Sequence, residues 1–366
     1  SLKDHSDRVA FTLVCPAWAD PKILDGRFPE GPWCVAQARG GRWPNRMAWL
    51  AGAASITPVI GRHDIYLSGW QWPLGCKDQP FVGILHDLRI LDPTWNDATV
   101  SPLRRATWRM LWDLSVRACT ERAAAIVAPS QYTLDHMAQL GYKSRQPTIV
   151  VPHGVDHDLW GIRANDEMLA ATLARIGATS GCDFVLGVGQ HTPHKNFPRL
   201  LEGFAAHLSH EDAKAQLVIV GGENVETVKL RARVAQLGLE KRVVLAGSIA
   251  FDDLRVLMSR ARIFAFPSLF EGFGLPVLEA FAAGTPVVTS AATSLGEIAG
   301  DAAVLVNPTD TTEIGNAIAR LWADNIERER LAEAGRARAA LFRWSDTARR
   351  YLELFEMMAS AQGARQ

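Results

Sequence analysis

The sequence predicts an α/β protein with two domains, each a doubly wound parallel sheet covered by helices. The chain of 366 residues is long for a single hydrophobic core and suits two domains of roughly 150 to 200 residues each. Short apolar runs of strand length alternate with helical stretches along most of the sequence. Such alternation is the pattern of parallel sheets joined by helical crossovers.

Residues 262–289 contain one complete unit of this kind. Residues 263–266 are an apolar run of strand length, and the proline and serine after them end it. A glycine-bearing loop follows, and Pro276 suits the first helical position, so a helix begins near Leu275. The next strand is expected at 286–289. In open parallel sheets, ligands bind at the carboxyl ends of the strands, in front of helix N-termini.

The loop of this unit offers groups for a ligand with both charge and hydroxyls. Gly272 and Gly274 allow close approach of the backbone, and the N–H groups of the first helical turn favour a phosphate. Glu271 and Glu279 flank them, and carboxylates only accept hydrogen bonds, so they suit hydroxyl groups. A nucleotide sugar has both features. The alternative is that the glycines serve only the turn and Glu279 only complements the helix dipole.

A second anion-binding arrangement follows the strand expected at 184–188. Gly189 opens its loop, and Lys195 precedes a helix from about Pro198. A lysine in this place suits a phosphate as a point charge. The two histidines of the loop have no third ligand at a convincing spacing, which disfavours a metal site.

Other elements follow from the same signals. Further strands are expected at 9–14, 64–68, 81–85, 125–128, 148–151, 217–220, 243–245 and 303–306. Further helices are expected at 103–124, 130–140, 311–323 and 326–341 and from 344. Residues 16–60 are rich in proline, glycine and tryptophan without a sustained period, which predicts loops with short helices.

The sequence EGFGLPVLE at 271–279, preceded by FPS and followed by AGTPVV, resembles the E-x7-E signature of the retaining glycosyltransferases of family 4. Their fold, GT-B, has two Rossmann-like domains that face across a cleft. The resemblance implies metal-independent transfer of a hexose from a nucleotide diphosphate sugar to a glycan or lipid-linked glycan, with no further cofactor. It is greatest to bacterial mannosyltransferases of surface polysaccharide synthesis, so the expected donor is GDP-mannose.

The resemblance also implies roles for single residues. Glu271 would contact the donor sugar, Glu279 the ribose, and Lys195 the diphosphate, while the loop at Gly247 and Ser248 would lie by the base. The implied donor-binding residues are Gly189, Gln190, Lys195, Gly247, Ser248, Glu271, Gly272, Phe273, Gly274, Leu275 and Glu279. The implied catalytic residues are His86, Glu271 and Lys195.

His86 follows the strand expected at 81–85. A histidine at this end of a parallel strand is well placed for ligand contact, and a structural role is the alternative. The resemblance favours contact, because family members commonly carry a histidine at this strand end, near the C6 hydroxyl of the sugar.

The expected domains follow from the resemblance as well. Residues 1–160 would form the acceptor-side domain, with 345–366 as a helix packed back on it. Residues 161–344 would bind the donor, with the linker near 157–180.

Two features depart from the family pattern. Members usually have a strand, a glycine-rich loop and a helix before the strand expected at 9–14, and no such loop is found here. Either the chain is a fragment or processed form, or it has dispensed with the loop. The second case suggests an alternative function, a catalytically impaired relative that binds nucleotide sugars or acts as a scaffold. Many members also have an arginine where this chain has Gln190, which leaves Lys195 with more of the diphosphate charge. A glycosidase, which also uses two carboxylates, is a further alternative.

The composition bears on partners and location. The 39 basic residues balance the 39 acidic ones, so no net charge attracts nucleic acid. The five scattered cysteines favour reduced thiols in a cytoplasm. No apolar run approaches the ~20 residues of a membrane span, and the N-terminus lacks a signal-peptide pattern. Arginine and tryptophan alternate in 103–124, which predicts either a peripheral contact with the inner face of a membrane or an amphipathic helix with a solvated arginine face.

Overall fold

A computed structural model gives the fold, and it describes residues 11–16, 33–38, 57, 61–69, 76–95, 100–208 and 214–363. These residues divide into two compact units. The second unit comprises His153–Arg343. The first comprises Ser101–Pro152, the helix that begins at Trp344, and the described residues up to Trp95. Each unit is an α/β structure with a parallel sheet, as the sequence predicts.

The first unit is built on a four-stranded parallel sheet. Its strands, in spatial order, are β3 (Tyr66–Ser68), β4 (Phe81–Ile84), β5 (Ala125–Ala128) and β6 (Thr148–Val150). Its described helices are η3 (Arg89–Leu91), α3 (Pro102–Arg122), α4 (Gln131–Gln139) and α15 (Trp344–Gly363). Ser130 caps α4 with its hydroxyl, as its position before the helix predicts.

The two faces of this sheet are covered by different helices. Alternate strand residues point to opposite faces, so Phe81 packs toward α3 and α4 while Val82 packs toward α15. Leu354 and Met358 of α15 join the second of these clusters. The Thr347 hydroxyl at the start of α15 donates to the carbonyl of Pro152 at 2.7 Å.

One expectation for the N-terminal part is wrong. A strand, β2 (Trp33–Ala38), lies within the stretch that was expected to hold only loops and short helices. It pairs in parallel with β1 (Phe11–Pro16) over the full length of both. Proline and glycine on either side obscure a six-residue run whose first residues favour strands. The rest of 17–56 lies outside the described residues.

The second unit has a six-stranded parallel sheet in the order β12-β11-β10-β7-β8-β9. The strands are β7 (Phe184–Val188), β8 (Gln216–Val220), β9 (Val243–Gly247), β10 (Ile263–Phe266), β11 (Val287–Ser290) and β12 (Val304–Val306). The chain places β8 and β9 on one side of β7, then crosses to place β10, β11 and β12 on the other. The strand order therefore reverses between β7 and β10.

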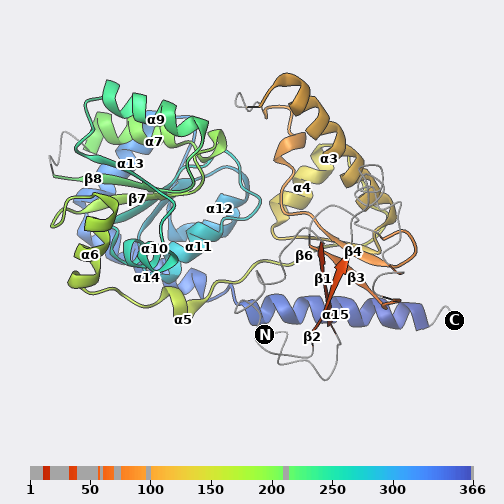
Figure 1. The fold of residues 1–366 in the computed structure, drawn as a ribbon. Helices are drawn as coiled ribbons and strands as arrows, with labels where there is room; N and C mark the ends of the chain where they lie inside the picture. Colours follow the sequence, from red (N-terminus) through yellow and green to blue (C-terminus); the bar gives the residue numbers. More distant parts are fainter. Residues whose placement is uncertain are drawn as a thin grey trace. The chain divides into compact units, whose positions relative to one another are not determined.

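Helices cover both faces of this sheet, as Figure 1 shows. One face packs against α7 (Phe197–Gly203), α9 (Val225–Gln236) and α13 (Thr311–Ala323). The other packs against α6 (Asp166–Ile176), α10 (Phe251–Arg260), α11 (Leu275–Ala282) and α12 (Thr293–Ala299). The helix α14 (Asn325–Ala339) contributes Leu331 to the first cluster and Ala339 to the second. This arrangement is the doubly wound pattern that the alternation of elements predicts.

The segment expected to link the domains is helical instead. Asp156 caps α5 (His157–Trp160), and Asn165 caps α6. Trp160 is buried in the core of the second unit, so these helices are part of that unit. The helix α5 has only four residues, and an interruption of five residues separates it from α6, so the segment lacks the long apolar period by which helices are recognised.

Because α15 covers one face of the first sheet, we expect its buried side to hold that unit together. Leu354 is 3% exposed, so Leu354→Ala should lower the free energy of unfolding of the first unit by about 2 to 4 kcal/mol. Met357, on the same helix, is 52% exposed, and Met357→Ala should change it by less than about 0.5 kcal/mol. Chemical denaturation measures both. Equal effects of the two substitutions would contradict the packing of α15.

Candidate active site

Most of the predicted donor-binding residues of the second unit lie in loops that follow its strands, while Gly247 ends β9 and Leu275 and Glu279 belong to α11. The loop after β7 holds Lys195, and the loop after β10 holds Glu271. These two strands pair in parallel at the point where the strand order reverses. In doubly wound sheets, this point is where the loops diverge and leave a crevice for ligands.

Lys195 and Glu271 are brought together by this arrangement. The Lys195 ammonium Nζ donates to Glu271 Oε1 at 2.7 Å, although the two residues are 76 positions apart. Their side chains are only 16% and 15% exposed. Lys195 Nζ also lies 4.9 Å from the centre of the Phe266 ring. The pair is therefore partly withdrawn from water. In such a place a charge without a partner is costly.

Asn196 fixes the loop that carries Lys195. Its backbone is left-handed, with φ at 61°, a conformation that asparagine tolerates better than most residues. Its amide Nδ2 donates to the carbonyls of Pro267, at 2.9 Å, and Pro308, at 2.6 Å. The Leu269 N–H donates to the His194 carbonyl at 2.7 Å. The two loops are thus held together through the backbone on both sides of Lys195. Sequence reasoning gave Asn196 no such role, although an asparagine just before a helix is a recognisable signal.

The loops after β7, β8 and β9 also meet. The φ of Gly189 is 149°, which favours glycine, and a Cβ there would lie 3.1 Å from Lys195 Cδ, so a side chain at this position would press on Lys195. A Cβ on Gly221 would lie 1.7 Å from the Gly189 carbonyl oxygen, so this position requires glycine too. The structure therefore places Gln190, Gly247 and Ser248 around the pair Gly221–Gly222. Neither glycine of that pair was among the predicted site residues.

The loop before α11 adopts the conformation that its glycines allow. Gly274 precedes the helix with φ at 122°, so Leu275 is the first helical residue, and Pro276 takes the second position instead of the first. Phe273 is buried, with its ring 5.0 Å from that of His153. Only the backbone of Phe273 can contribute to a ligand site. The Ser294 hydroxyl lies 2.8 Å from the Phe273 carbonyl and holds the loop.

Glu279, in α11, has a different environment from Glu271. It is half-buried, and no described residue forms a hydrogen bond with its carboxylate. Burial raises its pKa from the ordinary 4.5 to about 7, because the charged form is poorly solvated there. Near neutral pH its carboxyl is therefore partly protonated, and the protonated form both donates and accepts hydrogen bonds.

Three predicted or candidate histidines take different positions. His86 follows β4 in the first unit, where its Nε2 lies 2.9 Å from the Gly69 carbonyl. His191 is buried with Nδ1 2.8 Å from the Thr227 hydroxyl, and desolvation lowers its pKa. His194 supports the loops through its carbonyl. Among the residues that the structure describes, no three histidines, cysteines or carboxylates are grouped as a metal site.

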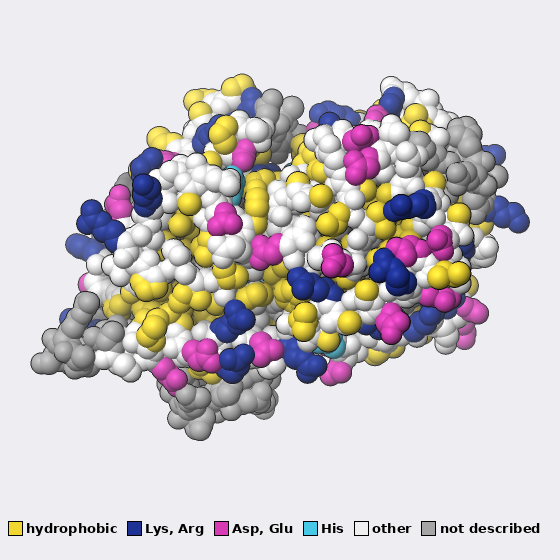
Figure 2. Space-filling view, turned by 180° about the vertical axis from the view of Figure 1, so that it is seen from behind, with side chains coloured by type: hydrophobic (Ala, Val, Ile, Leu, Met, Phe, Trp, Pro, Cys, Tyr) yellow, Lys and Arg dark blue, Asp and Glu magenta, His cyan; other side chains and the backbone are white. Residues whose placement is uncertain are grey.

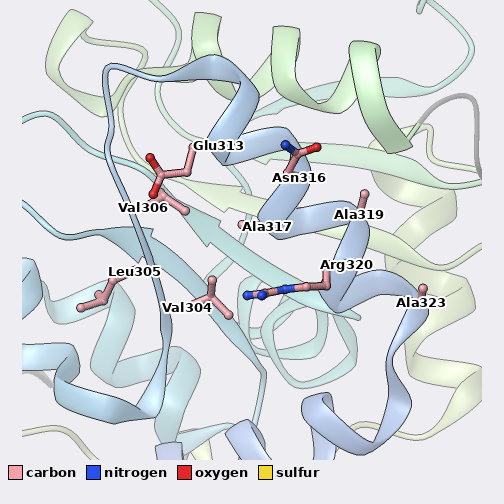
Figure 3. A pocket seen from close by; sticks show the side chains of 9 residues that line it. All are labelled: Val304, Leu305, Val306, Glu313, Asn316, Ala317, Ala319, Arg320 and Ala323. Carbon is pink, nitrogen blue, oxygen red and sulfur yellow. The ribbon is translucent and has the colours of Figure 1, made fainter.

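Two cavities lie elsewhere in the second unit. The larger, about 560 Å³, runs between the edge strand β12 and α13, and Figure 3 shows Arg320 of α13 extending toward Val304. The smaller, about 220 Å³, lies among the loop after β7, α7 and α9. Neither is lined by a predicted site residue.

The surface bears on the expected partners. On the face shown in Figure 2, basic and acidic side chains are interspersed. No helix in the described part of the chain is both long and apolar enough to cross a membrane.

On α3, the Arg104 guanidinium lies 4.8 Å from the centre of the Trp108 ring, and Arg109 donates to the Leu91 and Asp92 carbonyls. The peripheral membrane contact of this helix stays a prediction.

Two family models match the chain. The model for glycosyl transferases group 1 matches residues 174–338, and the model for glycosyltransferase family 4 matches residues 6–159. A solved structure of Anabaena HepE in complex with UDP-glucose has a TM-score of 0.75 and 21% identity over 97% of this chain and 93% of that one. Fold and matches together define a glycosyltransferase of the GT-B class. The two models cover most of the sequence, and the chain belongs to the glycosyltransferases of family 4.

Curated relatives include mannosyltransferases. The MMP alpha-(1->4)-mannosyltransferase of Mycolicibacterium hassiacum is 34% identical over 57% of this chain and 47% of its own length. The O-antigen chain mannosyltransferase B of Escherichia coli is 31% identical over 48% of this chain and 46% of its own length. The matched part spans about half the length of these relatives.

The environment of Glu279 predicts how stability depends on pH. Its pKa is raised on folding, so the folded state holds the proton more tightly, and the protein loses stability as the pH rises from 4.5 through about 7. Glu279→Gln should therefore match the wild type at pH 5 and exceed its free energy of unfolding by about 2 kcal/mol at pH 8.

Chemical denaturation across this pH range measures the difference. Glu333 is exposed on α14, and Glu333→Gln serves as the matched control, for which we expect no such trend. A constant difference between Glu279→Gln and the wild type from pH 5 to pH 8 would contradict the raised pKa.

Proposed function

We propose that the chain is a retaining glycosyltransferase that uses a nucleotide diphosphate hexose, with GDP-mannose as the best candidate donor. The observation that carries this proposal is the convergence of Lys195 and Glu271 where the strand order reverses. A cation for the diphosphate and an acceptor for sugar hydroxyls lie side by side there. The proposed acceptor is a glycan or a lipid-linked glycan.

The proposed reaction divides the work among these residues. The bond between the anomeric carbon and the diphosphate oxygen breaks, and the acceptor hydroxyl oxygen forms the new bond on the same face of the sugar. The leaving phosphate oxygen takes the proton of that hydroxyl. Lys195 and the N–H groups at the start of α11 would stabilise the charge that develops on the diphosphate. Glu271 would orient the sugar through its hydroxyls.

The other predicted site residues are proposed to bind the ribose, the rest of the nucleotide and the transferred sugar. The partly protonated carboxyl of Glu279 suits the ribose hydroxyls, because it both accepts and donates hydrogen bonds. Gln190 and Ser248, near Gly222, are proposed to line the nucleotide part of the site. From the first unit, His86 is the residue that we propose for contact with the transferred sugar. A cytoplasmic location is proposed because Cys119 and Cys182 are free thiols.

Mannose is favoured by the names of the relatives. Both curated relatives above are mannosyltransferases, while the Anabaena structure contains UDP-glucose, so UDP-glucose is the competing donor. The glycosidase alternative has no support, because the family is one of glycosyltransferases. The alternative of an impaired nucleotide-sugar-binding relative differs only in turnover.

Nucleotide binding tests the donor class. We expect GDP, from a panel with UDP, ADP, dTDP and CMP, to raise the melting temperature most. A ligand at 100 times its Kd adds about 2.7 kcal/mol to the free energy of unfolding. Lys195→Ala should lose most of this effect, because its ammonium is the proposed phosphate contact. Lys229→Ala, a change of the same kind at an exposed position of α9, should retain it. If no nucleotide stabilises the wild type, the proposed function fails.

Product analysis tests the mechanism. An α-linked donor should give an α-linked product, because attack occurs on the face that the diphosphate leaves, and proton NMR of the anomeric signal measures this. Excess EDTA should leave the rate within about twofold, because Lys195 and backbone N–H groups are proposed to replace a metal. A β-linked product would contradict retention. A loss of activity in EDTA that Mg²⁺ restores would contradict metal independence.

A further inference from the structure

The hydrogen bonds of Glu271 converge on one carboxylate oxygen. Lys195 Nζ and the Ser268 hydroxyl both lie 2.7 Å from Oε1. Among the described residues, no side chain forms a hydrogen bond with the other oxygen, Oε2. Lys195 Nζ has Glu271 as its one hydrogen-bond partner in the same set. Each of the two charged groups therefore has the other as its one charged hydrogen-bond partner among the described residues.

The groups that the proposed donor needs are thus already occupied with each other. The ammonium has three N–H donors but only one positive charge, so a diphosphate that binds Lys195 competes with Glu271 for that charge and draws the ammonium away from the carboxylate. Glu271 would then be left as a half-buried carboxylate without a cation, close to a second anion. The loss of its partner and the closeness of the diphosphate are both unfavourable for Glu271. An intact nucleotide sugar avoids the loss of a partner, because its hydroxyls can donate to Glu271 in place of the ammonium.

We propose that the Lys195–Glu271 ion pair makes the site discriminate between the intact donor and the nucleoside diphosphate product. The proposal rests on the function proposed above. With the sugar bound, each charge has a new partner, so opening the ion pair costs little. Once the sugar has been transferred, Glu271 regains Lys195 and weakens the hold on the diphosphate. The ion pair therefore favours release of the product.

Ser268 is a positioning residue that acts on the ion pair through Glu271. It is fully buried, and its hydroxyl lies within reach of three acceptors, Glu271 Oε1 at 2.7 Å, the His194 carbonyl at 2.8 Å and the Phe270 carbonyl at 3.3 Å. A hydroxyl has a single proton and can satisfy one of them at a time. When Lys195 is drawn to the diphosphate, Ser268 is the remaining donor for Glu271. It lowers the cost of opening the pair.

The test compares the affinities for the diphosphate and for the donor. We would measure the Kd of GDP and of GDP-mannose by titration calorimetry for the wild type and for Glu271→Gln, Glu271→Asp and Ser268→Ala. Glu271→Gln removes the charge that holds Lys195, so GDP should bind about fivefold tighter, while GDP-mannose should gain less. The advantage of the donor over the product should shrink accordingly.

The other two variants separate the ion pair from simple repulsion. Glu271→Asp retains the charge but is one methylene too short to hold Lys195 at 2.7 Å, so GDP binding should also tighten. Repulsion of the phosphate alone predicts no change for this variant. Ser268→Ala should weaken GDP about threefold, because Glu271 then has no other donor when the pair opens. Two neighbouring substitutions are expected to act in opposite directions.

A matched control comes from another ion pair of the same unit. Arg233 and Glu202 form an ion pair at 2.8 Å, so Glu202→Gln should leave both Kd values unchanged. Thermal melting confirms that each variant is folded. Equal or weaker binding of GDP to both Glu271 variants would overturn the proposal. Absence of GDP binding to every protein, the wild type included, would instead refute the proposed function, and another diphosphate of the panel that binds the wild type would take its place in the comparison.

Discussion

The pairing of β10 with β7, Ile263 opposite Val185 and Phe264 opposite Leu186, is the constraint on which the candidate site depends. These strands are parallel, so their carboxyl ends lie at the same edge of the sheet, and the loops that follow them start side by side. Both faces of the sheet are buried, so a shift by one residue would move every side chain of β10 to the wrong cluster. Core packing therefore fixes the position of a polar pair that contributes little to the core itself.

Hydrogen bonds between neutral groups hold the loops near the site in place, whereas the charged side chains can change partners. Asn196 ties its loop to the carbonyls of Pro267 and Pro308. Such bonds need no change when a ligand arrives. The ion pair of Lys195 and Glu271 must change when a ligand binds, because the proposed donor forms contacts with both residues. A site built in this way can exchange its charged contacts while its backbone stays in place.

Much of the fold is predictable from sequence because its signals are local. The strands at 184–188 and 263–266 are short, apolar and closed by glycine or proline, and the structure has them at these positions. Of the helices in the expected linker, α5 has only four residues and is too short to show a period, and α6, with eleven residues, was not recognised either. The residue types of the site were also visible. Their convergence was not, because alternation of strands and helices predicts a parallel sheet without saying that β10 is the neighbour of β7.

The two glutamates of the motif show how an anion fits between acidic groups. An isolated carboxylate would repel a diphosphate, and two would repel it more. Glu271 is compensated by Lys195, at 2.7 Å. Glu279 has no such cation among the described residues, but burial raises its pKa to about 7, so much of its charge is removed by a proton near neutral pH. One glutamate is thus neutralised by an ion pair and the other by protonation. The positive end of α11 lies in the chain between them, and with both carboxylates compensated it can favour an anion together with Lys195.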